Sequence, residues 1–378
     1  MNARERVLTA LNHREPDKVP IDLGSSEVTT ITRVAYDNLR EYLGMAPDLC
    51  PKNHSIVLGT LDPGEDLLQR YQIDCRPVHI KGPSAFEFNE MADGSFCDEY
   101  GVRWRPASYY YDAVERPLAN CRSVKDLEKA AWPDPLDPGR VDGLREEARD
   151  LCESTDCAIV ADIAALGPFE GACMLRGYDK FCMDLYLDPR FAEALLDKIT
   201  ETAIALLGVY LDAVGDYVQV VAQGDDVGMQ TNLYISPEMY RTFVKPRQKR
   251  IFDFVHARTE AKVFMHSCGA VYNVIPDFIE IGVDILNPIQ RSAVGMDIVK
   301  LKQTFGDDIC FWGGGIDVQQ VLPSASLEEI DEEVRRAIDV LAPGGGYVFA
   351  PSHNIQADVT PDRVHRTYEA ALKYREYK

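Results

Sequence analysis

The chain has 378 residues, of which 46% are hydrophobic and 27% charged, a composition that is ordinary for a globular protein. Lysine and arginine number 40 against 61 aspartate and glutamate residues, so the formal net charge is −21 and nucleic acid is excluded as a partner. No apolar run approaches the roughly 20 residues of a membrane span, and the first residues lack the apolar core of a secretion signal. We therefore expect a cytoplasmic protein without a membrane partner.

The ten cysteines are scattered along the chain, at positions 50, 75, 97, 121, 152, 157, 173, 182, 268 and 310. In a long chain without an export signal, such scatter is typical of reduced thiols rather than of a disulfide framework. We expect most of these thiols to be core residues.

The first part of the chain predicts a helix, a strand and an antiparallel layer. Apolar residues at helical spacing predict a helix over Glu5–His13, and Val19–Gly24 reads as a first strand. Short alternating segments between about 70 and 120, separated by Gly, Pro and Asp, predict an antiparallel hairpin layer inserted before the main body. A helix is expected around 141–154.

From residue 158 onward, apolar strand-like runs alternate with amphipathic helical stretches, a pattern that favours a parallel sheet covered by helices. The expected helices include Pro189–Ala213, Pro237–Arg258 and Ser326–Leu341. The expected strands are Ala158–Ala161, Tyr217–Ala222, Lys262–Met265, Asp284–Leu286, Ile309–Trp312 and Tyr347–Ala350.

The residues that follow these strands favour a barrel over a doubly wound sheet. Neither a Gly-x-Gly-x-x-Gly turn after the first strand nor a phosphate-binding loop occurs. Nearly every strand ends in a small or reactive residue, and a shared site built from many strand ends is typical of a (β/α)₈ TIM barrel. We therefore predict an α/β protein in which residues 1–378 form one barrel domain. The strand ends are Asp162, Gln223–Asp226, His266–Gly269, Asn287–Pro288, Gly313–Gly315 and Ser352–His353.

The segment His266–Gly269 carries the strongest chemical signal. Residues i and i+2 at a strand end share a face, so the imidazole of His266 and the thiol of Cys268 can converge as two ligands of a zinc ion. A core cysteine beside a hydrogen-bonded histidine is the alternative. His353 is the candidate third ligand, and Cys310 competes with it, although Cys310 lies inside its strand and is expected to be packed core.

Other polar residues at strand ends are candidates for catalysis or substrate binding. Asp226 and Glu170 are the candidate acid or base groups, and either residue is also a candidate for the metal shell. For Asp225 and Asp226 a helix N-cap is an equal alternative, and for Glu170 it is a solvated position in a first helical turn. The candidate substrate-binding residues are Asp225, Asn287 and Trp312.

Several segments resemble the uroporphyrinogen decarboxylase superfamily over essentially the whole chain. This resemblance implies a (β/α)₈ barrel. The similar segments are Val263–Gly269, Gly282–Asn287, Trp312–Asp317, Arg4–Leu11 and Pro16–Pro20.

Within that superfamily, the chain resembles the cobamide-dependent (methylcobalamin) methyltransferase branch more than the true decarboxylases. The decarboxylases carry an N-terminal Met-Arg-Gln-Ala-Gly-Arg motif that grips substrate carboxylates, whereas this chain reads Ile21–Glu27 there, without arginine. The methyltransferases bind zinc through His-x-Cys and a distant cysteine. His266 and Cys268 match the first pair, and His353 stands in the place of the third ligand.

The resemblance implies a zinc-dependent methyltransferase that moves a methyl group between a small substrate and the cobalamin of a partner corrinoid protein. The chain itself has no Asp-x-His-x-x-Gly cobalamin-binding motif. Because a His₂Cys site is less electron-rich than HisCys₂, we expect demethylation of an oxygen-bound methyl group, as in an aromatic methyl ether. The alternatives are a metal-independent decarboxylase of a porphyrin-like or other carboxylated substrate, and a non-catalytic barrel that binds a corrinoid or tetrapyrrole.

Overall fold

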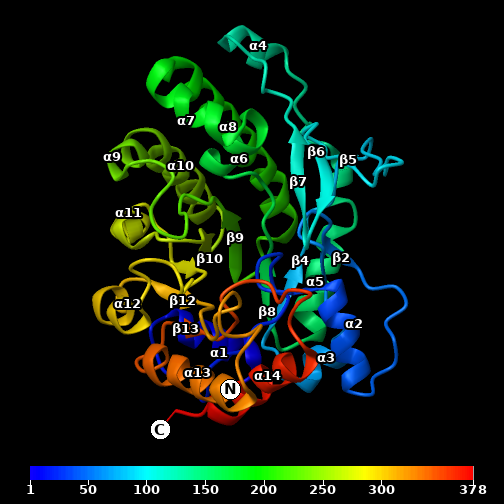
Figure 1. Ribbon diagram of the computed structural model, residues 1–378, viewed down its shortest axis with the longest axis vertical. Helices are drawn as coiled ribbons and strands as arrows, with labels where there is room; N and C mark the ends of the chain where they lie inside the picture. The colour runs from blue at the N-terminus through cyan, green and yellow to red at the C-terminus, as the bar shows by residue number, and fades with distance from the viewer. Residues whose placement is uncertain (378) are drawn as a thin grey trace.

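The protein is built around a parallel sheet that curls into a barrel with helices outside it (Figure 1). The computed structural model describes residues 1–377, and within this range seven strands form the sheet in the order β13-β12-β11-β10-β9-β8-β4. The predicted TIM-like barrel is thus confirmed. The strands are β4 (Cys75–Val78), β8 (Ala158–Ala161), β9 (Val220–Gly224), β10 (Lys262–His266), β11 (Ile285–Asn287), β12 (Cys310–Trp312) and β13 (Tyr347–Val348).

The expected first strand closes the barrel. Residues 19–22 of the expected strand Val19–Gly24 lie between the last strand, β13, and the first, β4, and Ile21 forms an isolated parallel bridge with Phe349. Phe349, just after β13, donates its N–H to the carbonyl of Pro20 (2.9 Å) and accepts from the N–H of Asp22 (2.8 Å). On the other side, Asp74 donates its N–H to the carbonyl of Ile21 (2.9 Å). The segment therefore completes the ring.

Side chains alternate along each strand between the interior of the barrel and the surrounding helices. In β10, Phe264 belongs to the interior cluster, whereas Val263 and Met265 pack with the outer helical layer. Val7 and Leu11 of helix α1 (Ala3–Leu11) join the interior cluster, so this helix plugs the amino-terminal end of the barrel. The carboxyl-terminal end is left for the polar residues.

Helices and helical turns follow most strands and cover the outside of the barrel. The predicted helices over 189–213 and 326–341 are present as α8 (Pro189–Val214) and α13 (Leu327–Leu341). The remaining helices are α2 (Arg33–Tyr42), α3 (Glu65–Arg70), α4 (Val124–Lys129), α5 (Leu144–Ser154), α6 (Pro168–Arg176), α7 (Tyr178–Leu187), α9 (Pro237–Met239), α10 (Lys245–His256), α11 (Ile275–Glu280), α12 (Ile298–Phe305) and α14 (Pro361–Tyr374), with single turns at Pro138–Val141, Tyr240–Val244 and Tyr272–Val274.

The antiparallel insertion exists, but it is shorter than predicted. Strands β5 (Phe96–Cys97), β6 (Arg103–Ala107) and β7 (Tyr110–Glu115) form a three-stranded antiparallel sheet beside the barrel (Figure 1). Residues 71–78, however, lead into the barrel strand β4. A second small sheet, which the sequence did not indicate, joins β1 (Ile31–Thr32), β3 (Thr60–Leu61) and β2 (Asn53–Ser55).

The sequence placed the start of the antiparallel insertion too early, at about residue 70, for a physical reason. Asp74 and Arg76 interrupt the apolar residues around them and so imitate a half-exposed strand, yet only 2% of Asp74 and 6% of Arg76 are exposed. Both are buried because each is ion-paired, Asp74 with two arginines and Arg76 with Glu65. Because ion pairing allows these charged side chains to be buried, their polarity does not mark a solvent-exposed face.

All ten cysteines are free thiols, as the sequence predicts. In the described part of the chain, we find no helix with the length and hydropathy needed to cross a bilayer.

Asp74 ties both ends of the chain to the barrel. Its carboxylate lies 2.5 Å from Nη1 of Arg6 in α1 and 2.8 Å from Nη2 of Arg375, which directly follows α14. The same carboxylate accepts the N–H of Ile21 in the closing segment at 2.8 Å. One buried anion thus joins four parts of the fold.

We expect Asp74→Asn to lower the free energy of unfolding by about 3–5 kcal/mol, because it leaves the buried guanidinium of Arg375 without its carboxylate. Urea unfolding followed by circular dichroism measures this loss. The control is Asp216→Asn, which removes an exposed pair with Arg145 and should cost about 0–1 kcal/mol. Equal losses in the two variants would contradict the role of Asp74.

Candidate active site at the carboxyl ends of β9 and β10

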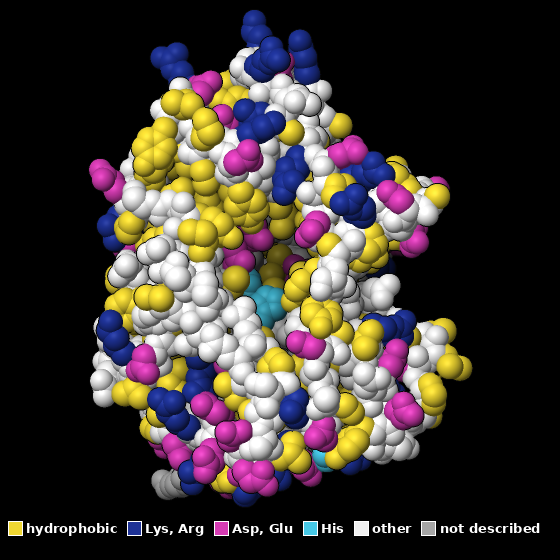
Figure 2. Space-filling view, in the orientation of Figure 1, with side chains coloured by type: hydrophobic (Ala, Val, Ile, Leu, Met, Phe, Trp, Pro, Cys, Tyr) yellow, Lys and Arg dark blue, Asp and Glu magenta, His cyan; other side chains and the backbone are white. Residues whose placement is uncertain are grey.

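Three side chains of different chemistry converge where β9 and β10 end. The Sγ of Cys268 lies 3.1 Å from Oδ2 of Asp226, and Nε2 of His266 lies 3.7 Å from Oδ1 of the same carboxylate. One ligand atom from each residue lies within 4.8 Å of the others. Histidine and acidic side chains are visible in the central hollow of the face shown in Figure 2, bordered by hydrophobic side chains. The geometry brings together an imidazole, a thiol and a carboxylate.

The loops after β9 and β10 approach each other because both carry glycine. A Cβ on Gly228 would lie 2.5 Å from the carbonyl oxygen of Cys268, and Gly269 has a φ of +92°, which favours glycine. The close approach lets the N–H of Cys268 donate to Oδ1 of Asp226 at 2.8 Å. The backbone of one loop therefore holds the carboxylate of the other.

Asn287 fixes the protonation of His266. The two residues are register partners at the ends of β11 and β10, and Nδ1 of His266 lies 2.6 Å from Oδ1 of Asn287. The amide of Asn287 donates through Nδ2 to the carbonyl of Trp312 at 2.9 Å, so its oxygen must be the atom that faces the imidazole. His266 then carries a proton on Nδ1, and its Nε2 faces Asp226. Asn287, expected to bind substrate, is fully buried and positions His266.

His353 lies beside the group of three. Its ring is perpendicular to that of His266, with 5.4 Å between the ring centroids. Burial, together with the neighbouring His266, lowers the pKa of His353 to about 4, so its imidazole is neutral and has a lone pair to offer. Cys310 is far from this set: its Sγ contacts the carbonyl of Leu11 at 3.4 Å, at the plugged end of the barrel. The packed-core interpretation of Cys310 is confirmed.

The two acidic residues after β9 have different environments. Asp225 is fully buried and accepts the N–H groups of Phe169 (3.3 Å) and Glu170 (2.7 Å) in the first turn of α6, and Nε2 of Gln248 at 2.8 Å. It therefore caps α6 from the neighbouring strand, and burial raises its pKa to about 6. Asp226 instead points to His266 and Cys268.

Glu170 lies next to Asp226. Its Oε2 accepts the N–H of Asp226 at 3.3 Å, and its pKa is raised well above the usual range by burial and by the charges of Asp226 and Asp225. A protonated carboxyl group is therefore favoured beside the metal-ligand candidates. Trp312, the remaining candidate for substrate binding, is fully buried inside the barrel, where its Nε1 donates to Oδ2 of Asp22 at 2.9 Å.

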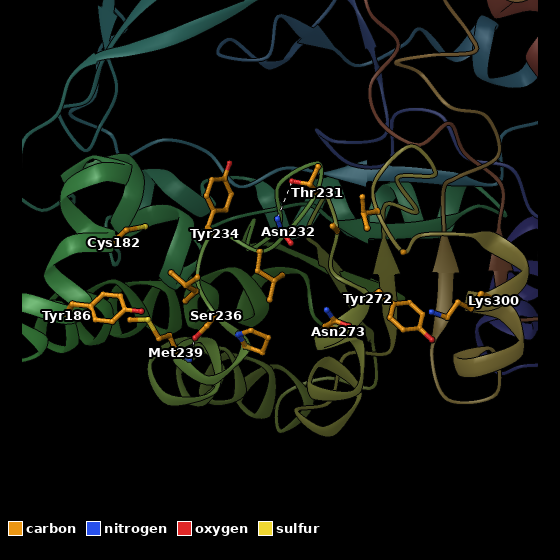
Figure 3. Close-up of a pocket in the computed structure, with 16 residues that line it drawn as sticks. Cys182, Tyr186, Thr231, Asn232, Tyr234, Ser236, Met239, Tyr272, Asn273 and Lys300 are labelled. Carbon is orange, nitrogen blue, oxygen red and sulfur yellow. Dashed lines mark hydrogen bonds between the residues drawn. The ribbon is translucent and has the colours of Figure 1, made fainter.

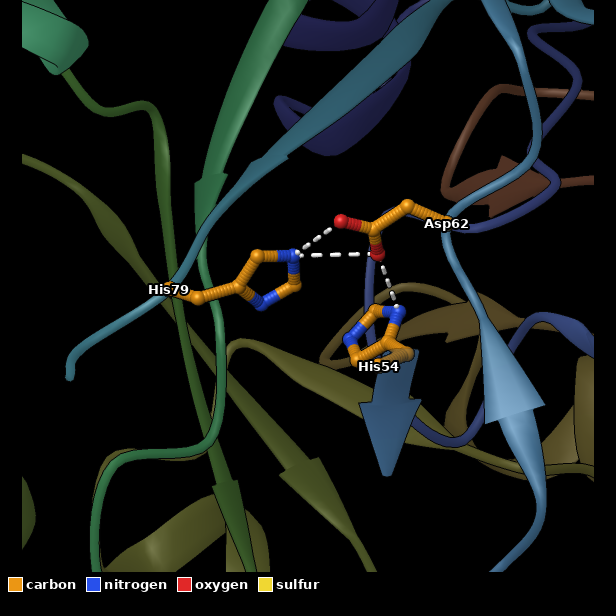
Figure 4. A group of neighbouring side chains, drawn as sticks. All are labelled: His54, Asp62 and His79. Carbon is orange, nitrogen blue, oxygen red and sulfur yellow. Dashed lines mark hydrogen bonds and ion pairs between the residues drawn. The ribbon is translucent and has the colours of Figure 1, made fainter. Parts of the chain in front are cut away.

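The sequence did not indicate a second cluster at the same end of the barrel. It consists of His54, Asp62 and His79 (Figure 4), and Asp162 contacts both histidines. Asp162 was noted as a strand end, and His79 directly follows β4. Recognising β4 as a barrel strand would have drawn attention to His79.

A separate pocket of about 560 Å³ lies beside the loops after β9 and β10 (Figure 3). Tyr186 of α7, Met239 of α9 and Lys300 of α12 are among its lining residues, together with Tyr234. None of the candidate metal ligands lines it within residues 1–377, so the pocket neighbours the site without containing it.

Comparison with known proteins places the chain among relatives of this fold. The family described as uroporphyrinogen decarboxylase (URO-D) matches residues 111–374. Curated relatives include a uroporphyrinogen decarboxylase of Bacillus cytotoxicus, which is 26% identical over 264 residues and aligns over 67% of this chain and 68% of its own length. A uroporphyrinogen decarboxylase of Geobacillus kaustophilus is 27% identical over 256 residues, which are 65% of this chain and 67% of the relative.

Among solved structures, a methyltransferase from Methanosarcina mazei is similar over 99% of both chains, with a TM-score of 0.66 and 20% identity. That likeness shows a shared fold. The matched family region runs from β7 to α14 and contains His266, Cys268, Asp226 and His353. The chain therefore belongs to the uroporphyrinogen decarboxylase (URO-D) family.

Proposed function

We propose that the protein is a zinc-dependent methyltransferase that moves a methyl group between a small substrate and the cobalamin of a corrinoid protein. The observation that carries the proposal is the convergence of His266, Cys268 and Asp226 at the carboxyl end of the barrel. The name of the Methanosarcina mazei relative supports the same class of reaction.

The donor set fits zinc. Zinc accepts imidazole, thiolate and carboxylate ligands, whereas magnesium and calcium prefer oxygen alone. His266 turns Nε2 toward Asp226, and its other ring nitrogen is held by Asn287, as is usual for metal-binding histidines.

Two residues compete for the third ligand position. Asp226 belongs to the group in which one ligand atom each of Asp226, His266 and Cys268 lies within 4.8 Å of the others. His353, the residue expected from the sequence, lies beside that group. With three protein ligands, one position stays open for substrate.

When bound, zinc supplies a Lewis acid for the oxygen of a methyl ether or for a substrate thiol. For an ether donor, the corrinoid of the partner protein would supply the acceptor of the methyl group. The oxygen that is released needs a proton. Glu170 is the group we assign to deliver it, because its carboxyl group is partly buried beside Asp226 and its pKa is raised.

Decarboxylation is the second candidate, favoured by the names of the Bacillus and Geobacillus relatives. A polycarboxylate substrate requires cationic side chains. The residues that surround the site are instead acidic: Glu170 and Asp226 lie together, and Glu27 lies near Asp162. Together with the absence of arginine from Ile21–Glu27, this favours methyl transfer.

Zinc analysis of protein purified without a histidine tag is the first test. We expect Cys268→Ala to lose one zinc equivalent per chain relative to the parent, because the thiolate is a ligand. Asp226→Ala and His353→Ala then identify the third ligand as the residue whose removal also costs that equivalent. The control is Cys152→Ala, at another half-buried cysteine, which should keep the zinc of the parent. An equal zinc content per chain in the parent and in Cys268→Ala would contradict the proposal.

The contact between Asn287 and His266 leads to a prediction about zinc affinity. We expect Asn287→Ala to weaken zinc binding by about 10–100-fold, since nothing then holds the tautomer and orientation of His266. Competition with a chromophoric chelator measures the affinity. Asn273→Ala, at a pocket residue, is the control. Unchanged affinity in Asn287→Ala would show that His266 is not a ligand.

Product analysis tests the reaction and its direction. With free cob(I)alamin as acceptor and methoxylated aromatics as donors, we expect methylcobalamin and the demethylated phenol to form in equal amounts. Chelator-treated protein and Cys268→Ala should be inactive, whereas Cys152→Ala should match the parent. Methylation of thiols alone would reverse the predicted direction, and zinc-independent release of carbon dioxide from a carboxylated substrate would establish the decarboxylase.

A further inference from the structure

We propose that His54, Asp62 and His79 form a second metal site, which takes a divalent transition-metal cation and is oriented by Asp162. This site is distinct from the one at His266 and Cys268. All four of its residues precede β9 and β10 in the chain. Its three ligands also lie before the family-matched region.

The three proposed ligands converge on one point. Nδ1 of His54 lies 2.8 Å from Oδ1 of Asp62, and Nε2 of His79 lies 3.1 Å from both oxygens of the same carboxylate. In Figure 4 the two imidazoles, carried by different segments, point toward Asp62. Ligand atoms around a tetrahedral zinc ion with bonds of 2.0–2.1 Å are about 3.3 Å apart. The observed contacts are close to that spacing.

Asp162 holds the opposite nitrogen of each histidine. Its Oδ2 lies 2.6 Å from Nε2 of His54 and 3.4 Å from Nδ1 of His79. Asp162 follows β8, and its side chain is 5% exposed. A carboxylate that accepts the second N–H of metal-binding histidines is the usual device for fixing their tautomer. The two remaining nitrogens, Nδ1 of His54 and Nε2 of His79, face Asp62.

Once the two histidines release their protons, this arrangement offers two imidazole nitrogens and one carboxylate to a single ion. The side chain of His54 is 1% exposed, and within residues 1–377 its Nδ1 makes no hydrogen bond, although Asp62 is close. A buried polar atom in this position requires a partner. Two imidazoles and one carboxylate are a ligand set for iron(II), zinc or manganese, and the imidazoles disfavour magnesium and calcium.

The proposed site lies at the mouth of the barrel. His79 directly follows β4 and Asp162 directly follows β8, two paired parallel strands whose carboxyl ends lie at the same edge as β9 and β10. His54 is in β2, and Asp62 directly follows β3, in the small sheet next to the mouth. Three protein ligands leave coordination positions for water or for a substrate oxygen.

The competing explanation places a proton, rather than a metal, on each histidine. His54 and His79 would then be imidazolium ions paired with Asp62 and Asp162, and the cluster would be a purely structural ring of ion pairs. The two explanations differ in metal content, which decides between them.

The experiment is metal stoichiometry by mass spectrometry on untagged protein that has been stripped with chelator, reloaded separately with Zn²⁺, Mn²⁺ or Fe²⁺, and desalted. For at least one of these metals we expect two equivalents in the parent and one in His79→Ala. The control is His256→Ala, which removes an imidazole paired with Asp284 near the amino-terminal end of β11 and should keep two equivalents. Equal metal in the parent and His79→Ala for all three metals overturns the proposal.

A second measurement covers the case in which His79→Ala does not fold. We expect Cys268→Ala to bind one Co²⁺ with a d–d absorption that lacks a thiolate-to-cobalt charge-transfer band, because the remaining ligands are nitrogen and oxygen. No bound Co²⁺ in this variant, when folded, overturns the proposal. Metal that is lost in His79→Ala but not in Cys268→Ala would instead refute the zinc site of the proposed function and leave the second site standing.

Discussion

The arrangement of both candidate metal groups depends on the closure of the barrel by the extended segment at residues 19–22. This segment hydrogen-bonds to Phe349 on one side and to Asp74 on the other, so the sheet has no free edge between β13 and β4. Asp74, neutralised by Arg6 and Arg375, anchors it. Only in a closed barrel do the carboxyl ends of all parallel strands surround one mouth.

Within that mouth, histidines are positioned by acceptors that fix which nitrogen carries the proton. Asn287 does this for His266, and its own orientation is fixed in turn by the carbonyl of Trp312. A neutral amide suits this position because its oxygen accepts a hydrogen bond from the imidazole N–H without adding charge next to Asp226. The buried carboxylate of Asp162 has the equivalent position against His54 and His79. In both places the orienting residue directly follows or ends a barrel strand.

The sequence predicted the barrel and the pair His266 and Cys268 because both depend on short-range patterns. Apolar runs of strand length, alternating with helices, identify parallel strands, and a His-x-Cys at a strand end places two side chains on one face. The different roles of Asp225 and Asp226 could be predicted only with the fold known. Asp225 caps α6, which begins more than fifty residues earlier in the chain, and no local pattern could show that contact.

The cluster at His54 and Asp62 was missed for a related reason. Both residues belong to the short antiparallel strands β2 and β3 or directly follow them, segments that carry no periodic apolar signal. His79 was obscured because buried ion pairs at Asp74 and Arg76 made β4 resemble a half-exposed hairpin.

The charge of the mouth bears on the class of substrate that the barrel accepts. Burial and the neighbouring Asp162 raise the pKa of Glu27 to about 7, and burial with Asp226 and Asp225 raises the pKa of Glu170. Carboxyl groups that already resist ionisation beside one another would resist it more strongly beside a polyanionic ligand. Binding such a ligand would therefore require either protons or additional cations. A neutral methyl donor carries no such cost, so these paired carboxyl groups are compatible with the proposed methyl transfer.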